Sequence, residues 1–271
     1  MGGTKILALA VNGGRVSSRR RIPTPPAYQE AVRAISGLVS EVSGGDPPGS
    51  VGVCAPGTPP GLGSTGAGNA RCLDGMPLGP DLEAALGMPI TLENDADCFT
   101  LAESLLGAGR GFGLVLGAVF GTGVGSGLVR EGRISRDKGA AHEWGHSVMQ
   151  PGGARCGCGG RGCVEAYLGG ASLAVSWRQM VGGRMGAPGG AGDAWRARVA
   201  ADLATCLAGL ARDARPDVLV VGGGVADAGL LDAGMSYARR LCGVPVARGA
   251  LGADAGALGA CISGTAAPPP A

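Results

Sequence analysis

Short continuous apolar runs alternate along the chain with stretches in which apolar residues recur at helical spacing. Ile6–Val11 and Val16–Ile22 have the composition of strands, and the Asn-Gly-Gly sequence between them is typical of a hairpin turn. Ala27–Val42 carries apolar residues three and four positions apart, as an amphipathic helix does. This alternation predicts an α/β protein.

The same pattern continues to the end of the chain. Further strands are predicted at Val51–Ala55, Ile90–Leu92, Leu114–Phe120, Gly125–Val129, Val218–Val221 and Val244–Ala247, and further helices at Pro80–Leu86, Ala96–Leu106, Ala197–Ala211 and Ala255–Ile262. Two halves that each begin with a hairpin indicate two lobes around a cleft. We predict an N-terminal lobe at 1–109, a C-terminal lobe at 110–265 with a metal loop at 146–163, and a disordered Pro/Ala-rich tail at 266–271.

Composition narrows the class of protein. A net charge of +2 over 271 residues is too small to attract nucleic acid or a membrane surface by bulk charge. The apolar runs have the length of strands and are interrupted by glycine, so no transmembrane helix is expected, and the N-terminus lacks the pattern of a signal peptide. We therefore expect a cytoplasmic protein, in which the six cysteines outside the metal loop are reduced thiols.

The most specific local pattern is one histidine followed by three closely spaced cysteines: His146, Cys156, Cys158 and Cys163. Three thiolates and one imidazole complete a tetrahedral zinc shell, and the glycines between the cysteines allow one tight loop to surround the ion. Four protein ligands close the shell, so the predicted site is structural. The alternative is a disulfide or free thiols on a surface loop, which a cytoplasmic setting and the odd number of cysteines disfavour.

Several segments together resemble the ROK family (repressors, open reading frames, kinases). They are Gly2-Gly3-Thr4-Lys5, Ala55-Pro56-Gly57, Asn69, Glu93-Asn94-Asp95-Ala96, Gly121-Thr122-Gly123-Val124-Gly125, Glu143-Trp144-Gly145-His146, Cys156-Gly157-Cys158-Gly159, Gly162-Cys163-Val164-Glu165 and Gly222-Gly223-Gly224. Their order and spacing match the family over nearly the whole chain. The resemblance implies a two-lobed, ribonuclease-H-like fold of the actin-like ATPase type, duplicated and α/β, with an interlobe cleft and often a dimer.

The resemblance also implies an ATP-dependent hexose kinase that phosphorylates a sugar hydroxyl, most often O6 of fructose, an N-acetylhexosamine or glucose. Asp95 would be the catalytic base. The sugar would be held by Gly57, Asn69, Asn94, Asp95, Glu143, His146 and Glu165. ATP with Mg²⁺ would be held by Gly2, Gly3, Thr4, Lys5, Gly121, Thr122, Gly123, Gly222, Gly223 and Gly224, because glycine turns offer backbone N–H groups to phosphate.

Three alternatives remain open at this point. Asp95 could cap the helix that follows it, a common role for aspartate. The family signature begins with an Asp two residues before its first glycine. Here Met1 occupies the position directly before Gly2, so that Asp is absent, and we expect a coding start further upstream. Otherwise the chain is a sugar-binding protein that has lost kinase activity. A sugar-responsive repressor is disfavoured, because it needs a helix-turn-helix domain before Gly2.

Overall fold

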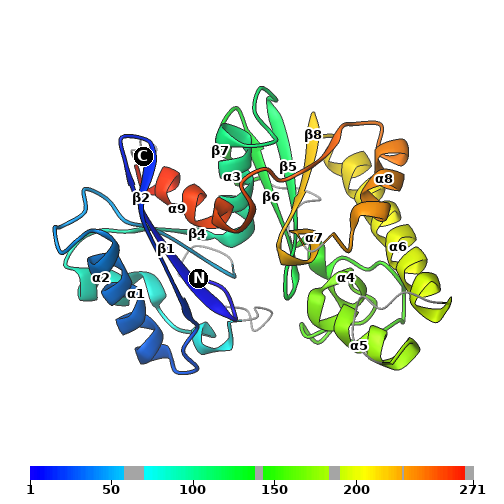
Figure 1. Cartoon of the computed structure of the whole chain (residues 1–271), viewed down its shortest axis with the longest axis horizontal. Coiled ribbons are helices and arrows are strands. Elements are labelled where there is room, and N and C mark those ends of the chain that lie inside the picture. Colours follow the sequence, from blue (N-terminus) through cyan, green and yellow to red (C-terminus); the bar gives the residue numbers. More distant parts are fainter. Residues whose placement is uncertain (58–69, 138–142, 183–189, 228, 266–271) are drawn as a thin grey trace. The chain divides into compact units, whose positions relative to one another are not determined.

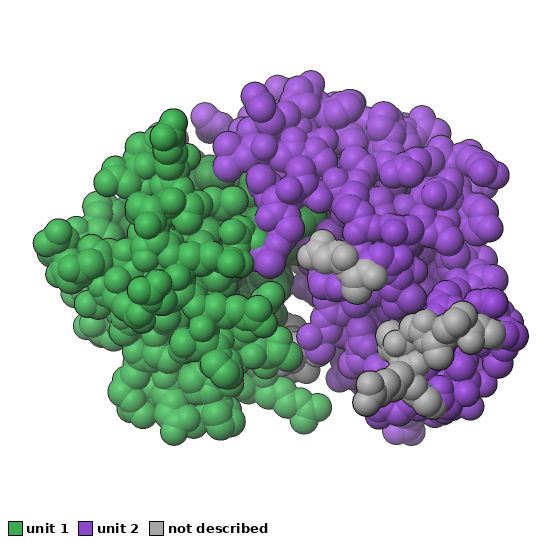
Figure 2. All heavy atoms as spheres, in the orientation of Figure 1, with its two compact units in different colours: residues 1–102, 254–271 green, residues 103–253 purple. Residues whose placement is uncertain are grey.

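The structure is a computed structural model that describes residues 1–57, 70–137, 143–182, 190–227 and 229–265 of the chain. The predicted alternation of strands and helices is confirmed (Figure 1). The chain forms two compact units (Figure 2), of which unit 1 contains residues 1–102 and 254–271, and unit 2 contains residues 103–253. The predicted tail at 266–271 lies outside the described residues.

The division into units differs from the predicted split at 109/110 because the last helix, α9 (Ala255–Thr265), packs against strands of unit 1. Two of the close contacts of α9, one with a strand of unit 1 and one with the helix that contains Cys98, require glycine. A Cβ atom on Gly52 would lie 1.8 Å from the carbonyl oxygen of Ala260, and one on Gly259 would lie 1.8 Å from that of Cys98. The chain therefore leaves unit 1 within a helix and returns to it just before α9.

Unit 1 is built around two short sheets. Its elements are β1 (Lys5–Asn12), β2 (Arg15–Pro23), α1 (Tyr28–Val42), β3 (Gly52–Ala55), the 3₁₀ turn η1 (Arg71–Leu73), α2 (Leu78–Leu86) and β4 (Thr91–Asn94). β1 and β2 form the predicted antiparallel hairpin, while β3 and β4 pair in parallel. The apolar face of α1 is buried in the same core as the residues of β3 and α2, as its spacing predicts.

Helix α3 (Asp95–Leu106) links unit 1 to unit 2, whose sheet has the strand order β7-β6-β5-β8-β9. The strands are β5 (Leu114–Phe120), β6 (Val124–Arg130), β7 (Arg133–Ile134), β8 (Val218–Gly222) and β9 (Val246–Arg248). The remaining elements are η3 (Trp144–His146), α4 (Glu165–Leu168), α5 (Gly170–Met180), α6 (Gly190–Ala214), α7 (Gly224–Asp227), α8 (Asp232–Leu241) and η4 (Gly252–Asp254). Within the described residues, no helix combines the length and apolar character needed to cross a membrane.

The sequence analysis missed α4, α5, α7 and α8. In α8 the buried face consists of Gly234, Met235 and Ala238, and the polar and apolar residues of this segment do follow a helical period, so the sequence carried a signal for α8 that was overlooked. Gly234 is needed there because a Cβ atom would lie 2.7 Å from a methyl carbon of Leu203 on α6. The packing of α8 on α6 thus depends on a close approach that periodicity alone does not reveal.

Candidate active site and metal cluster

Gly57 and Asn94 lie at the ends of two neighbouring parallel strands of unit 1. Asn94 is the last residue of β4, and Gly57 lies shortly after the end of β3. Ala55 of β3 pairs in register with Asn94 of β4, so the residues after both strands emerge at the same edge of the sheet. The side-chain Nδ2 of Asn94 donates a hydrogen bond to the carbonyl oxygen of Gly57 at 2.9 Å. Gly57 has a φ of 114°, which favours glycine. The structure therefore brings these two predicted sugar-side residues into contact.

The cap of helix α3 is Asn94. Its Oδ1 accepts hydrogen bonds from the backbone N–H groups of Ala96 at 2.9 Å and Asp97 at 3.2 Å. Asn94 therefore occupies the N-cap position of α3, which the sequence analysis had left open for Asp95. Asp95 is instead the first helical residue, where the positive end of the helix dipole favours a negative side chain.

The N-terminal glycine turn lies beside the same strand edge. The N–H of Gly2 donates to the carbonyl of Lys5 at 2.9 Å, and the hydroxyl of Thr24 donates to the carbonyl of Gly2 at 2.6 Å. The amino group of Met1 hydrogen-bonds the carbonyl of Cys54 on β3. The phosphate-binding role of this turn stays a prediction, and Asn69 lies outside the described residues.

The two glycine loops of unit 2 leave neighbouring parallel strands at one edge of the sheet. Val119 of β5 pairs in register with Gly222 of β8, so the turn Gly121–Gly123 and the loop at 222–224 lie side by side. Gly223 has a φ of 94°, and a Cβ atom there would lie 2.4 Å from the carbonyl oxygen of Phe120. A larger residue would push the two loops apart, so glycine is required by this packing.

The start of helix α5 supports the turn at 121–123. The N–H of Gly170 donates to the carbonyl of Gly121 at 2.9 Å, and that of Ala171 donates to the carbonyl of Thr122 at 3.3 Å. A Cβ atom on Gly170 would lie 2.6 Å from the Gly121 oxygen. Sequence reasoning missed this support, although the glycine pair at 169–170 is a signal of close backbone approach.

The four predicted metal ligands of unit 2 converge. Their ligand atoms all lie within 4.8 Å of one another. Sγ of Cys156 lies 3.7 Å from Nδ1 of His146, and Sγ of Cys158 lies 3.7 Å from Sγ of Cys163. A tetrahedral zinc ion with Zn–S bonds of about 2.3 Å and a Zn–N bond of about 2.0 Å would separate its ligands by roughly 3.6–3.8 Å. The residues therefore fit zinc, and the cysteines are not joined as disulfides.

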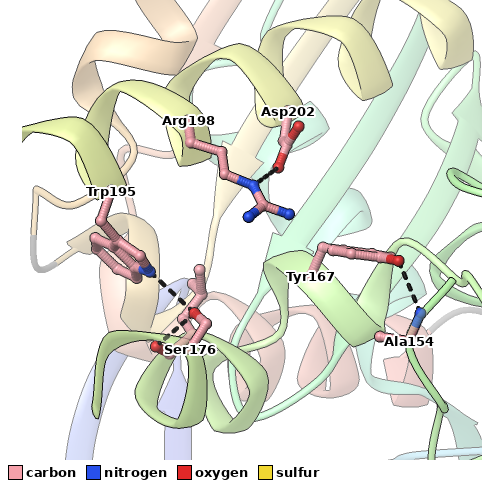
Figure 3. Close-up of polar contacts among 7 residues, drawn as sticks. Ala154, Tyr167, Ser176, Trp195, Arg198 and Asp202 are labelled. Carbon is pink, nitrogen blue, oxygen red and sulfur yellow. Dashed lines mark hydrogen bonds and ion pairs between the residues drawn. The ribbon is translucent and has the colours of Figure 1, made fainter. Parts of the chain in front are cut away.

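The metal loop is shaped by tight turns and by one tyrosine. Gly162 has a φ of 77°, and a Cβ atom there would lie 1.8 Å from the carbonyl oxygen of Gln150. The hydroxyl of Tyr167 accepts a hydrogen bond from the N–H of Ala154 at 2.8 Å (Figure 3), which anchors the chain just before Cys156. Sequence reasoning did not identify Tyr167. Burial raises the pKa of Cys163 to about 12, so its thiolate form requires a nearby cation.

The two predicted sugar-side carboxylates of unit 2 flank this loop. Glu143 is exposed and directly precedes η3, with a φ of 46° that is uncommon for a residue other than glycine. Oε2 of Glu165 accepts a hydrogen bond from the N–H of Val124 at 2.9 Å, and its Oε1 lies 4.0 Å from Sγ of Cys156. Glu165 therefore lies between the metal cluster and the residue that follows the glycine turn of unit 2.

The model of the ROK family matches residues 1–262. The chain belongs to the ROK family. An N-acetyl-D-glucosamine kinase from Citrobacter koseri is 35% identical over 252 residues, which cover 84% of this chain and 83% of that protein. Membership in the ROK family confirms the resemblance inferred from the motifs.

Solved ROK structures resemble the chain over almost its full length. A ROK hexokinase from Thermus thermophilus has a TM-score of 0.81 and 32% identity, covering 97% of this chain and 95% of that one. A ROK glucokinase from Streptomyces griseus, solved with glucose and AMPPNP, has a TM-score of 0.81 and 29% identity, covering 96% of both chains. These likenesses confirm the predicted actin-like ATPase fold and the enzyme class, an ATP-dependent phosphotransferase.

Proposed function

We propose that this ROK protein transfers the γ-phosphate of ATP to the primary O6 hydroxyl of N-acetyl-D-glucosamine. The choice of this substrate is supported by N-acetyl-D-glucosamine kinases from Citrobacter koseri and Escherichia fergusonii, which are 35% and 34% identical to the chain. Glucose is the second candidate, because the Streptomyces griseus glucokinase that binds glucose is 29% identical over 96% of the chain.

The observation that carries the proposal is the arrangement of Asn94 and Asp95 at the start of α3. Asn94 accepts hydrogen bonds from two of the first backbone N–H groups of the helix, and Asp95 follows it as the first helical residue. As the sugar oxygen bonds to the γ-phosphorus and the bond to ADP breaks, the carboxylate of Asp95 accepts the hydroxyl proton. The helix dipole at this position favours the ionised base.

The proposed sugar ligands are Gly57, Asn69, Asn94, Glu143, His146 and Glu165. Hydroxyl groups both donate and accept hydrogen bonds, so amides, carboxylates and an imidazole N–H suit them. Nδ1 of His146 faces Cys156 in the metal cluster, which leaves Nε2 to donate to a sugar oxygen. Metal binding and sugar binding would then share one side chain.

The proposed phosphate-binding segments are Gly2–Lys5, Gly121–Gly123 and Gly222–Gly224. The last two leave adjacent parallel strands, and their backbone N–H groups are suited to anions. Mg²⁺ bound with the nucleotide would neutralise charge on the phosphate oxygens. Zinc held by His146 and the three cysteines would cross-link the metal loop without an open coordination site.

An assay that measures ADP release in the presence of each candidate sugar tests the proposal. We expect the highest kcat/KM with N-acetyl-D-glucosamine, then glucose, and a phosphoester at O6 in the product by ³¹P–¹H NMR. A preference for fructose would contradict the proposed substrate. Sugar binding by calorimetry without any ADP release would instead favour a sugar-binding protein that has lost kinase activity.

A further inference from the structure

The backbone of Val124 is held from two sides. Its N–H donates to Oε2 of Glu165 at 2.9 Å. On the other side, Gly145 packs so closely on Val124 that a Cβ atom at Gly145 would lie 2.0 Å from the Val124 carbonyl oxygen. Val124 is buried and directly follows the glycine turn at 121–123. Both contacts therefore restrict the end of the proposed phosphate-binding turn.

The two residues that hold Val124 are neighbours of metal ligands. Gly145 precedes His146, and Glu165 comes two residues after Cys163. The chain segments that carry them also pair with each other, since the N–H of Val164 donates to the carbonyl of Ser147 at 3.0 Å. One ion bound by His146 and Cys163 would join these two segments directly to each other.

The second oxygen of Glu165 lies near the cluster. Its Oε1 lies 4.0 Å from Sγ of Cys156, while Oε2 is engaged with Val124. Because Glu165 comes two residues after the ligand Cys163 and lies beside Cys156, an ion that fixes the metal loop also restricts the position of the carboxylate that accepts from Val124. Charge-assisted hydrogen bonds of this kind are stronger than neutral ones.

We propose that Glu165 is a positioning residue for the nucleotide: it transmits the rigidity of the metal cluster to Val124 and so holds the turn at 121–124 ready for phosphate. This inference rests on the proposed function, in which that turn binds the phosphates of ATP. A preformed turn binds phosphate without the free-energy cost of ordering it. Metal binding therefore supports the nucleotide side as well as the sugar side.

The first test measures hydrogen exchange of the peptide that covers residues 120–126, in wild-type protein with and without its metal. We expect removal of the metal with a chelator to speed exchange in this peptide about tenfold, the effect of losing one charge-assisted hydrogen bond. A peptide covering β8 (Val218–Gly222) is the internal reference and should not change. Equal acceleration in both peptides would show general loosening and would overturn the proposal.

The second test uses variants of Glu165. In the metal-bound Glu165→Leu variant, the peptide at 120–126 should exchange hydrogen as fast as it does in metal-free wild type. Chelation of the metal should not speed this exchange further. Glu165→Gln keeps a carbonyl oxygen as acceptor and should stay close to wild type. Asp193→Asn, an exposed acid that pairs with Arg196 on α6, is the matched control. If the leucine variant does not fold, the glutamine variant and the wild-type measurement still distinguish the proposal from general loosening of the protein.

The third test measures AMPPNP binding by calorimetry in the absence of sugar, so that a role of Glu165 in sugar binding does not contribute. We expect Glu165→Leu and metal removal each to weaken binding about tenfold, and KM for ATP to rise more than kcat falls. Chelation that affects wild type and Glu165→Leu equally, or a purified protein without metal, would overturn the inference. A further outcome is that wild-type protein shows faster exchange at 120–126 on metal removal and yet binds no AMPPNP. That result would refute the proposed nucleotide role of the turn and not the link from the metal to Val124.

Discussion

Two adjacent side chains at the start of α3 have different roles. Asn94 holds the backbone of the helix and, through Nδ2, the carbonyl of Gly57. Asp95 follows it in the first helical turn. With Asn94 at the cap position, the proposed base Asp95 stands at the positive end of the helix dipole, which favours its negative charge.

Replacing Asp95 tests the catalytic base. Asp95→Asn keeps the shape of the side chain but cannot accept the hydroxyl proton, so we expect kcat to fall about 10³-fold. Sugar binding measured by calorimetry should remain within a few-fold of wild type. Asp46→Asn, at an exposed position of unit 1, is the control. A kcat close to that of the control would show that another group accepts the proton.

Replacing Asn94 tests the cap. Asn94→Ala removes both the acceptor for the helix and the donor to Gly57, so the free energy of unfolding should fall by about 1–2 kcal/mol in chemical denaturation. Asn94→Asp keeps the acceptor and loses only the donor, so its loss should be smaller. Equal losses in the two variants would mean that the contact with Gly57, and not the cap, stabilises this edge.

At the scale of elements, one buried carboxylate ties together the two connections between the units. Glu103 is completely buried. Its Oε2 accepts hydrogen bonds from the N–H groups of Ala108 at 2.9 Å and Ala250 at 3.0 Å, and its Oε1 accepts one from Leu251 at 2.8 Å. These residues adjoin the points where the chain passes between units, at 102/103 and 253/254.

We expect Glu103→Gln to lower the free energy of unfolding by about 3 kcal/mol, because its amide N–H₂ would face backbone N–H groups in a buried site. Thermal and urea denaturation measure this loss. Glu131→Gln, at the exposed β6–β7 turn of the same unit, is the control and should change stability by less than about 0.5 kcal/mol. A Glu103 variant as stable as the control would show that the three hydrogen bonds contribute little.

The metal loop is a second element whose order depends on distant parts of the chain. Cys158→Ser leaves three ligands for the ion, and the serine hydroxyl is a poor zinc ligand, so we expect loss of stoichiometric zinc in elemental analysis. The melting temperature should fall as well, because metal binding contributes to folding. Cys242→Ser, at a half-buried cysteine outside the cluster, should retain its zinc. Wild-type protein without zinc would contradict the site.

At the scale of the whole molecule, two compact units are joined by the middle of α3 and by the segment before α9. The family resemblance predicts that two such chains associate. We expect light scattering after size exclusion to give twice the chain mass of 26.4 kDa at micromolar concentration. A mass of one chain at all concentrations would refute the predicted homodimer without affecting the assignment of Asp95.

Features that depend on residues close together in the chain could be predicted without the structure. The strand at Leu114–Phe120 has the bounds that its apolar run predicts, and the face of α1 is buried as its spacing predicts. The four metal ligands lie within 146–163, so local turns are enough to bring them together. The motifs that resemble the ROK family are likewise short segments, and their combination is specific for that family.

Features that depend on contacts between distant segments became apparent only from the folded chain. That α9 joins unit 1 depends on backbone approaches at Gly52 and Gly259, and the link from Glu165 to Val124 joins an α-helix to a strand 41 residues away. Hydrogen bonds and glycine-dependent contacts of this kind leave no period in the sequence. Hydrophobic spacing records which side of an element is buried, whereas the partner it packs against is set by the fold.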